Sequence, residues 1–147
     1  MKKRIMVIGP NDKDKEKIIE LIEGERNLPH VQSMVYLDKT IQVPSSYLRG
    51  SGMMKHIIAT QQNASAILMI LSADRAFPVY SPNFAKVFRI PTIGLVLTRN
   101  DPYQEIGRLP CRRELEEAKV DIILVLDLEN DEQCQQLLHT ITLLKKE

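Results

Sequence analysis

Continuous apolar runs recur along the chain and alternate with segments of mixed polarity. Four such runs occur, at residues 5–8, 66–71, 92–97 and 120–126. Runs of this length and composition are typical of parallel strands that are covered on both faces. Residues 31–37 instead alternate apolar and polar, which predicts a strand with one wetter face. A turn at Asp38 leads from it to a return strand at 40–43, so the pattern predicts about six strands with one hairpin.

Segments with an apolar face or with helix-boundary residues lie between the strands. They predict helices at residues 15–23, 53–62, 82–88, 105–118 and 130–145. Gly107 and Pro110 predict an irregular first turn in the fourth helix. Asn130 is suited to cap the last one. Residues 44–52, which read PSSYLRGSG, are predicted to form a loop.

The alternation of strands and helices predicts parallel βαβ units and a doubly wound α/β sheet with helices on both faces. From the length of the chain we expect one domain over residues 1–147. Ligands of such sheets bind outside the carboxyl ends of the strands. Those ends here are predicted at residues 9–15, 43–46, 72–75 and 98–101, and after residue 126.

Composition excludes several classes of protein. The net charge is +1 and both signs are interspersed, so no bulk field favours nucleic acid or an anionic membrane. The two cysteines, Cys111 and Cys134, and the three histidines have no metal-ligand spacing. We therefore expect no metal site and a reducing, cytoplasmic compartment. The apolar runs are too short for a signal peptide or a membrane span.

The most informative stretch is RIMVIGPNDKDKEKIIE, near the amino terminus. It predicts a strand, a glycine turn at Gly9, a polar loop and a helix that begins near Lys15. This is the layout of the phosphate-binding loop G-x-x-x-x-G-K-[ST]. Gly9 and Lys15 have the required spacing, but Asp14 replaces the second glycine and Glu16 replaces the Ser/Thr. The frame of the loop is present, and much of its chemistry is absent.

With two further blocks, this stretch resembles the EutP/PduV family of ethanolamine- and propanediol-utilisation proteins from bacterial microcompartment operons. The blocks are VPSSYL at 43–48 and ASAILMILSADRAFPVYSPNFAKVFRIPTIGLVLTRND at 64–101. The resemblance covers nearly the whole chain. It implies a Ras-like P-loop NTPase fold and a GTPase-like ancestry.

The resemblance also implies which positions would bind a nucleotide. The family carries a phosphate loop G-P-x-x-x-G-K-T-T, a switch segment D-T-P-G-E-Y and a base-reading motif T-K-x-D. In the switch segment, Gln42 replaces the metal-side aspartate, and Ser45 replaces the glycine whose amide would meet the γ-phosphate. The positions carried over as a vestigial nucleotide site are Gly9, Asp14, Lys15, Glu16, Thr98, Arg99 and Asp101.

The acidic residues of the loop oppose a triphosphate. Two like charges about 4 Å apart repel by roughly 1 kcal/mol in water and about 4 kcal/mol at an effective dielectric near 20. We expect Asp12 or Asp14 to occupy the anion site at the helix N-terminus, so that the loop is satisfied without nucleotide. The run DKDKEK favours Lys15 as a solvated lysine over a phosphate ligand. Asp101 is interpreted as a loop or cap residue rather than a guanine-reading carboxylate.

The resemblance, with the departures from its motifs, therefore implies a degenerate GTPase-like protein without catalytic residues, metal or cofactor. It would act as a binding, scaffolding or regulatory module in ethanolamine or propanediol utilisation. Its partner would be a microcompartment shell protein, an encapsulated enzyme or a second copy, in the cytoplasm or at the microcompartment. One alternative is an active GTP- or ATP-binding protein that uses magnesium as a GTPase or phosphotransferase. Another is a nucleotide binder without turnover that reads the base through Asp101.

Overall fold

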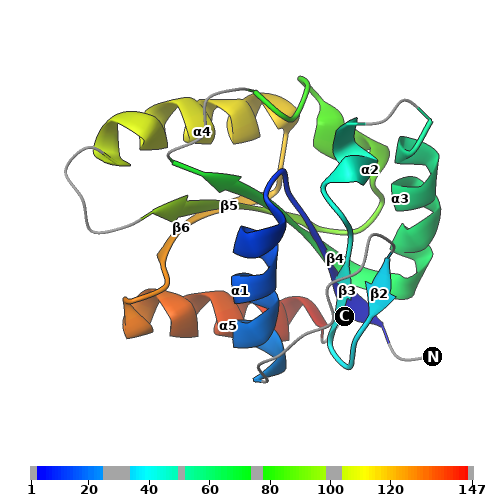
Figure 1. Ribbon diagram of the computed structural model, residues 1–147, viewed down its shortest axis with the longest axis horizontal. Helices are drawn as coiled ribbons and strands as arrows, with labels where there is room; N and C mark the ends of the chain where they lie inside the picture. The colour runs from blue at the N-terminus through cyan, green and yellow to red at the C-terminus, as the bar shows by residue number, and fades with distance from the viewer. Residues whose placement is uncertain (1–2, 25–33, 50–51, 74–77, 99–103, 146–147) are drawn as a thin grey trace.

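A six-stranded sheet forms the centre of the molecule (Figure 1). The computed structural model describes residues 3–24, 34–49, 52–73, 78–98 and 104–145. The strand order is β2-β3-β1-β4-β5-β6, and among the described strands only β2 and β3 pair antiparallel. This confirms the predicted mostly parallel sheet with one hairpin. The strands are β1 Arg4–Ile8, β2 Val35–Tyr36, β3 Thr40–Gln42, β4 Ala64–Ser72, β5 Thr92–Thr98 and β6 Ile122–Asp127.

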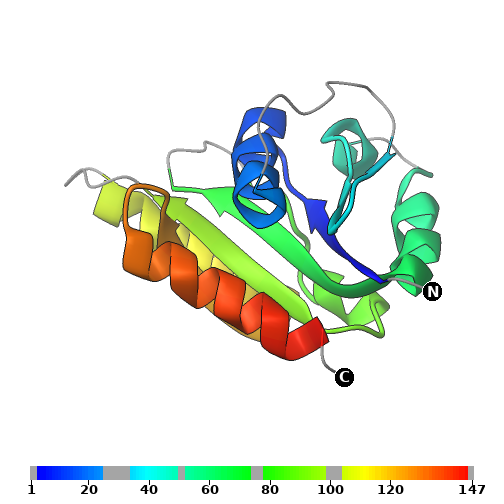
Figure 2. The same cartoon turned by 90° about the horizontal axis from the view of Figure 1, so that it is seen from below.

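Helices cover both faces of the sheet, as predicted. Figures 1 and 2 show α1 and α5 on one face, with α2, α3 and α4 on the other. The α-helices are α1 Asp12–Glu23, α2 Ser46–Arg49, α3 Met54–Thr60, α4 Gln104–Ala118 and α5 Asp131–Lys145. Two short 3₁₀ helices, η1 Gln61–Asn63 and η2 Phe84–Val87, lie before β4 and before β5.

The continuous apolar runs form strands because each strand has a core on both of its faces. In β1, Met6 and Ile8 belong to the core under α3 and α4, while Ile5 and Val7 belong to the core under α1 and α5. Successive side chains of a strand point to opposite faces, so a strand buried on both sides needs an apolar residue at every position. The parallel pairing of β1 with β3 and β4 brings the carboxyl ends of these strands to one edge.

Several predicted boundaries differ from the structure. The first helix begins at Asp12 rather than near Lys15. The predicted loop at 44–52 contains the four-residue helix α2. Within the described part of the predicted strand 31–37, only Val35–Tyr36 is strand. The first two differences fall at the carboxyl ends of β1 and β3, where the candidate site lies.

Two differences lie on the face of the sheet that α4 covers. The predicted helix at 82–88 is reduced to the 3₁₀ helix η2, because Asn83 adopts a left-handed conformation with φ 65°. The Asn83 amide donates to the carbonyl of Glu117 in α4, which ties the segment before η2 to that helix. α4 is helical from Gln104, with Pro110 inside it, so the predicted irregular first turn is wrong.

Candidate functional site

The connection from β1 to α1 is short and tightly packed. Only Gly9, Pro10 and Asn11 separate the strand from the helix. A Cβ on Gly9 would lie 3.2 Å from the carbonyl oxygen of Ile70 and 3.5 Å from Cγ of Lys15. The glycine therefore lets the end of β1 lie close to β4 and leaves room for the Lys15 side chain to pass.

Asn11 caps α1 and occupies the amides of its first turn. Its backbone is extended, and its side-chain Oδ1 accepts hydrogen bonds from the amides of Lys13 at 2.9 Å and Asp14 at 3.1 Å. The amide of Lys15 donates to the Asn11 carbonyl at 3.2 Å. A phosphate loop presents amides of this region to its ligand. Here the helix itself uses those of residues 13 to 15.

Lys15 is fully buried, so its interpretation as a solvated lysine is wrong. Its Nζ donates to the carbonyl oxygen of Val43 at 2.7 Å and lies 2.9 Å from Oδ1 of Asp12. β3 pairs directly with β1, which brings the Val43 carbonyl beside the start of α1. A buried ammonium needs partners of this kind, because an unpaired charge in the interior is costly.

The Asp12 carboxylate links α1 to the segment that follows β3. Its Oδ1 accepts from the Ser45 amide at 2.9 Å, and its Oδ2 accepts from the Ser45 hydroxyl at 3.0 Å. Arg49 Nη2 donates to the same Ser45 hydroxyl oxygen at 3.1 Å. Asp12 therefore binds the Lys15 ammonium and Ser45, whereas Asn11 rather than an acid caps the amides of this helix N-terminus. Asp14, the other candidate, lies half-buried in the same turn.

Electrostatics couples Asp12 and Lys15. Burial alone would raise the pKa of the Asp12 carboxyl, but hydrogen bonds from Lys15 and Ser45 and the charge of Lys15 outweigh burial and hold the pKa below its ordinary value. Burial lowers the pKa of the Lys15 ammonium, and Asp12 offsets this only in part. The lysine thus depends on its carboxylate partner to remain charged inside the protein.

The positions implied for magnesium do not form a metal cluster in the described part of the chain. Gln42, in β3, is buried, and its Oε1 has no hydrogen-bond partner among the described residues. Glu16 is half-buried on α1. Within those same residues, no group of three or more His, Cys, Asp or Glu side chains could hold a metal ion.

The implied base-reading positions are only partly placed. Thr98 is the buried last residue of β5. Arg99 and Asp101 lie outside the described residues. The structure thus brings Gly9 and Lys15 together at the end of β1, and it does not place the motif that would read a base.

The sequence did not predict the contacts of four groups that build this site, although the resemblance had already placed Ser45 in the switch segment. They are the Asn11 cap, the carbonyl of Val43, the donors of Ser45 and the Arg49 guanidinium. The dipeptide Asn11–Asp12 was a local signal, since asparagine favours the N-cap and an acid favours the first turn. The other three come from a segment about 30 residues further along the chain, and no local pattern predicts their contacts.

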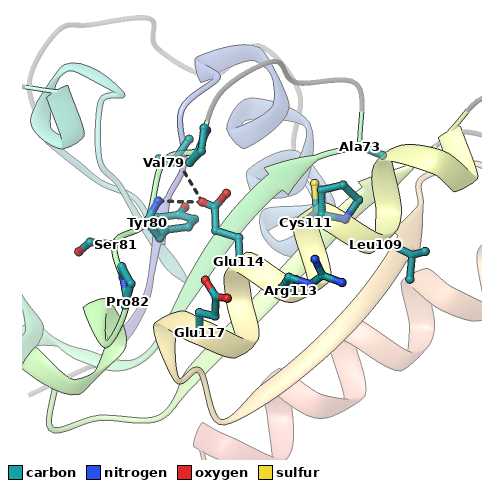
Figure 3. Close-up of a pocket in the computed structure, with 12 residues that line it drawn as sticks. Ala73, Val79, Tyr80, Ser81, Pro82, Leu109, Cys111, Arg113, Glu114 and Glu117 are labelled. Carbon is teal, nitrogen blue, oxygen red and sulfur yellow. Dashed lines mark hydrogen bonds between the residues drawn. The ribbon is translucent and has the colours of Figure 1, made fainter.

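A cavity of about 790 Å³ lies elsewhere, between residues 78–82 and α4 (Figure 3). Its walls are largely apolar, with Leu109 at 71% exposure. Asp12, Lys15, Ser45 and Arg49 are not among the residues that line it. The buried carboxylate of Glu114 accepts hydrogen bonds from the amides of Val79 at 2.9 Å and Tyr80 at 2.8 Å. This acid holds the segment against α4, so its role here is structural.

Solved GTP-binding proteins share the fold. The chain matches a probable GTP-binding protein engB with a TM-score of 0.61 at 13% identity, covering 97% of this chain and 98% of that one. The FeoB G-domain from Methanococcus jannaschii matches with a TM-score of 0.59 at 12% identity over 100% of both chains. Translation elongation factor SelB from Methanococcus maripaludis matches with a TM-score of 0.55 at 11% identity, over 97% of this chain but 35% of that one. The fold is therefore that of the Ras-like P-loop GTPases.

Sequence comparison adds the family. The propanediol utilization protein PduV of Citrobacter freundii is 33% identical over 95 residues, which span 64% of this chain and 63% of that protein's length. In the described part of the chain, no helix is long and apolar enough to cross a membrane. The model of the PduV-EutP family, described as ethanolamine utilisation – propanediol utilisation, matches residues 2–143, and the chain belongs to this family.

Proposed function

We propose that this protein is a pseudo-GTPase of ethanolamine or propanediol utilisation, and that it works as a binding or scaffolding module without nucleotide hydrolysis. It binds a shell protein or an enzyme of the microcompartment, or a second copy of itself, in the cytoplasm or at the microcompartment surface. The cofactor positions of a GTPase stay empty in its working state.

The observation that carries this proposal is the occupied phosphate site. Lys15, the lysine at the phosphate-loop position, has no exposed surface and is bonded to Asp12 and Val43. The amides of residues 13 to 15 are bonded to Asn11. A triphosphate would have to displace the Asp12 carboxylate and compete with it for the same donors, at a cost that a preformed loop does not have.

The alternative of an active GTPase finds less support in the same residues. Glu16 stands where a hydroxyl would hold magnesium, and Gln42 stands where an aspartate would support it. The chain therefore offers weaker means of neutralising the charge that develops during phosphoryl transfer.

The proposal is tested by affinity capture of the protein from cells that express its microcompartment operon. The captured shell proteins or enzymes are quantified in lysates supplied with GTP, supplied with GDP, or depleted of nucleotides with apyrase. We expect the same partners in the same amounts under all three conditions. A partner that is captured only with GTP would favour the active GTPase instead.

A further inference from the structure

We propose that the Asp12 carboxylate performs the structural role of the γ-phosphate of a bound nucleotide, and that it holds residues 43–49 permanently in the arrangement a GTPase adopts only with nucleotide. This inference rests on the proposed function and adds its regulation: the switch segment is fixed rather than switched. Asp12 is thus a positioning residue for that segment.

The contacts of Asp12 carry the inference. In switch GTPases, the γ-phosphate and its magnesium hold the switch loops, which are released upon hydrolysis. Here one carboxylate accepts both the ammonium of Lys15 at 2.9 Å and the amide of Ser45 at 2.9 Å. These donors stand at the positions of the phosphate-loop lysine and of the switch amide. One covalently attached anion therefore bridges the two segments that a nucleotide would bridge.

Further contacts fix the same segment. The Lys15 ammonium also bonds the carbonyl of Val43, and the Ser45 hydroxyl bonds Oδ2 of Asp12. Ser45 is 4% exposed, and α2 begins at the next residue. Arg49, in the last turn of α2, donates back to the Ser45 hydroxyl. The segment from β3 to α2 is thereby tied to α1 at both its backbone and its side chains.

An anion that belongs to the chain cannot be hydrolysed or released. The switch segment therefore has one state, and the surface that α2 presents, with Ser46 and Arg49 exposed, is always formed. A partner that recognises this segment would bind it without any nucleotide cycle. Binding to a preformed segment avoids the cost of ordering it.

Amide hydrogen exchange of residues 43–49 tests the inference, with Asp12→Ala as the principal variant. Losing the bridge should raise the exchange rates of these amides at least about tenfold, because local opening then breaks fewer contacts. Asp131→Ala is the matched control, since Asp131 also follows an asparagine cap as the first residue of α5. Asp131→Ala should leave exchange at 43–49 unchanged.

Chemical rescue separates this role from ordinary packing. In Asp12→Ala, the Lys15 ammonium and the Ser45 amide lose their anion. Inorganic phosphate at about ten times its dissociation constant should therefore slow the exchange again by about tenfold. The wild-type protein should not respond to phosphate, because its site is filled. Asp12→Asn, which keeps the side-chain shape, should show the same loss with weaker rescue.

Two results would overturn the inference: unchanged exchange at 43–49 in both Asp12 variants, or lost protection that phosphate fails to restore. If circular dichroism shows that the Asp12→Ala variant is globally unfolded, the Asp12→Asn variant alone decides between the outcomes. Nucleotide binding by the wild-type protein would contradict the proposed function, and it is measured separately by calorimetry. The two failures are therefore distinguishable.

Discussion

A lysine that has no exposed surface needs polar partners inside the protein. Lys15 is held by one carboxylate and one backbone carbonyl, and its aliphatic stem passes beside Gly9. Removing one member of a buried polar pair leaves the other without a partner, which costs more than the pair contributes as a whole. The site therefore stabilises the protein only as a complete unit.

Lys15→Met should lower the free energy of unfolding by about 1–3 kcal/mol, because the Val43 carbonyl is left unpaired in the interior. Lys17→Met is the control, since Lys17 is an exposed residue of the same helix and its replacement should cost less than about 0.5 kcal/mol. Urea unfolding of the three proteins gives the comparison. Equal stabilities would mean that Lys15 is solvated after all.

The lowered pKa of Asp12 predicts a dependence of stability on pH. The unfolded chain takes up a proton at the ordinary carboxyl pKa, and the folded protein takes one up only at lower pH. The contribution of Asp12 is therefore complete above the ordinary pKa and is lost as the pH falls through the lowered one. Urea unfolding from neutral pH down to about pH 2 measures this loss. Asp12→Asn should show a shallower decline over the acidic part of that range, and an identical decline would contradict the assignment.

At the scale of elements, the start of α1 decides what the site can do. The helix begins at Asp12, where a phosphate loop would still be open, because the Asn11 cap satisfies its first amides. Amides that are hydrogen-bonded within the helix or to its cap are no longer available to bind an anion. The cap is thus part of the reason that the phosphate site is closed.

Asn11→Ala should destabilise the protein by about 1 kcal/mol, because the amides of Lys13 and Asp14 lose their acceptor. Asn11→Ser, which keeps a capping oxygen, should restore most of the loss. Thermal or urea unfolding of both variants checks this. A serine variant no better than the alanine variant would mean that the cap contributes little.

A separate prediction concerns Glu114, which holds the segment before η2 against α4. Glu114→Ala should cost about 1–3 kcal/mol, because the half-buried amide of Val79 and the buried amide of Tyr80 lose the carboxylate that they share. Glu117, whose side chain is exposed on the same helix, provides the control, and Glu117→Ala should change the stability by less than about 0.5 kcal/mol. Similar losses in the two variants would contradict the structural role of Glu114.

The central strands β1, β4 and β5 were predictable from sequence because burial on both faces demands an apolar residue at nearly every position. The run at 66–71 lies within β4, and the run at 92–97 lies within β5. The start of α1 was misplaced because the spacing of Gly9 and Lys15 suggested a loop, although Asn11 locally favours a cap. The Asn11 cap, rather than the phosphate-loop spacing of Gly9 and Lys15, therefore determines where α1 begins.

The candidate site was less predictable than the strands. An acid at the helix N-terminus could be expected from the helix dipole alone. The burial of Lys15 depends on a carbonyl 28 residues away, and only the pairing of β1 with β3 brings that carbonyl near. The run DKDKEK looks like a solvated helix start because sequence patterns do not report such contacts.

For the molecule as a whole, the fold is that of the Ras-like P-loop GTPases, and the chain's own residues bond one another at the phosphate-loop positions. The sheet still gathers the ends of β1 and β3 at one edge, where a ligand of this fold would bind. Asp12 connects those two ends in place of such a ligand. In this fold the bonds of Asp12 to Ser45 connect the start of α1 to the segment that leads into α2.

Calorimetric titration of the purified protein with GTP, GDP and ATP, each with and without magnesium, tests the central claim most directly. We expect no saturable heat at nucleotide concentrations up to about 1 mM, which means less than roughly 4 kcal/mol of binding free energy. A saturable isotherm with a dissociation constant below about 10 μM would show that a nucleotide displaces Asp12 from Lys15. That result would contradict the account of a self-occupied phosphate site.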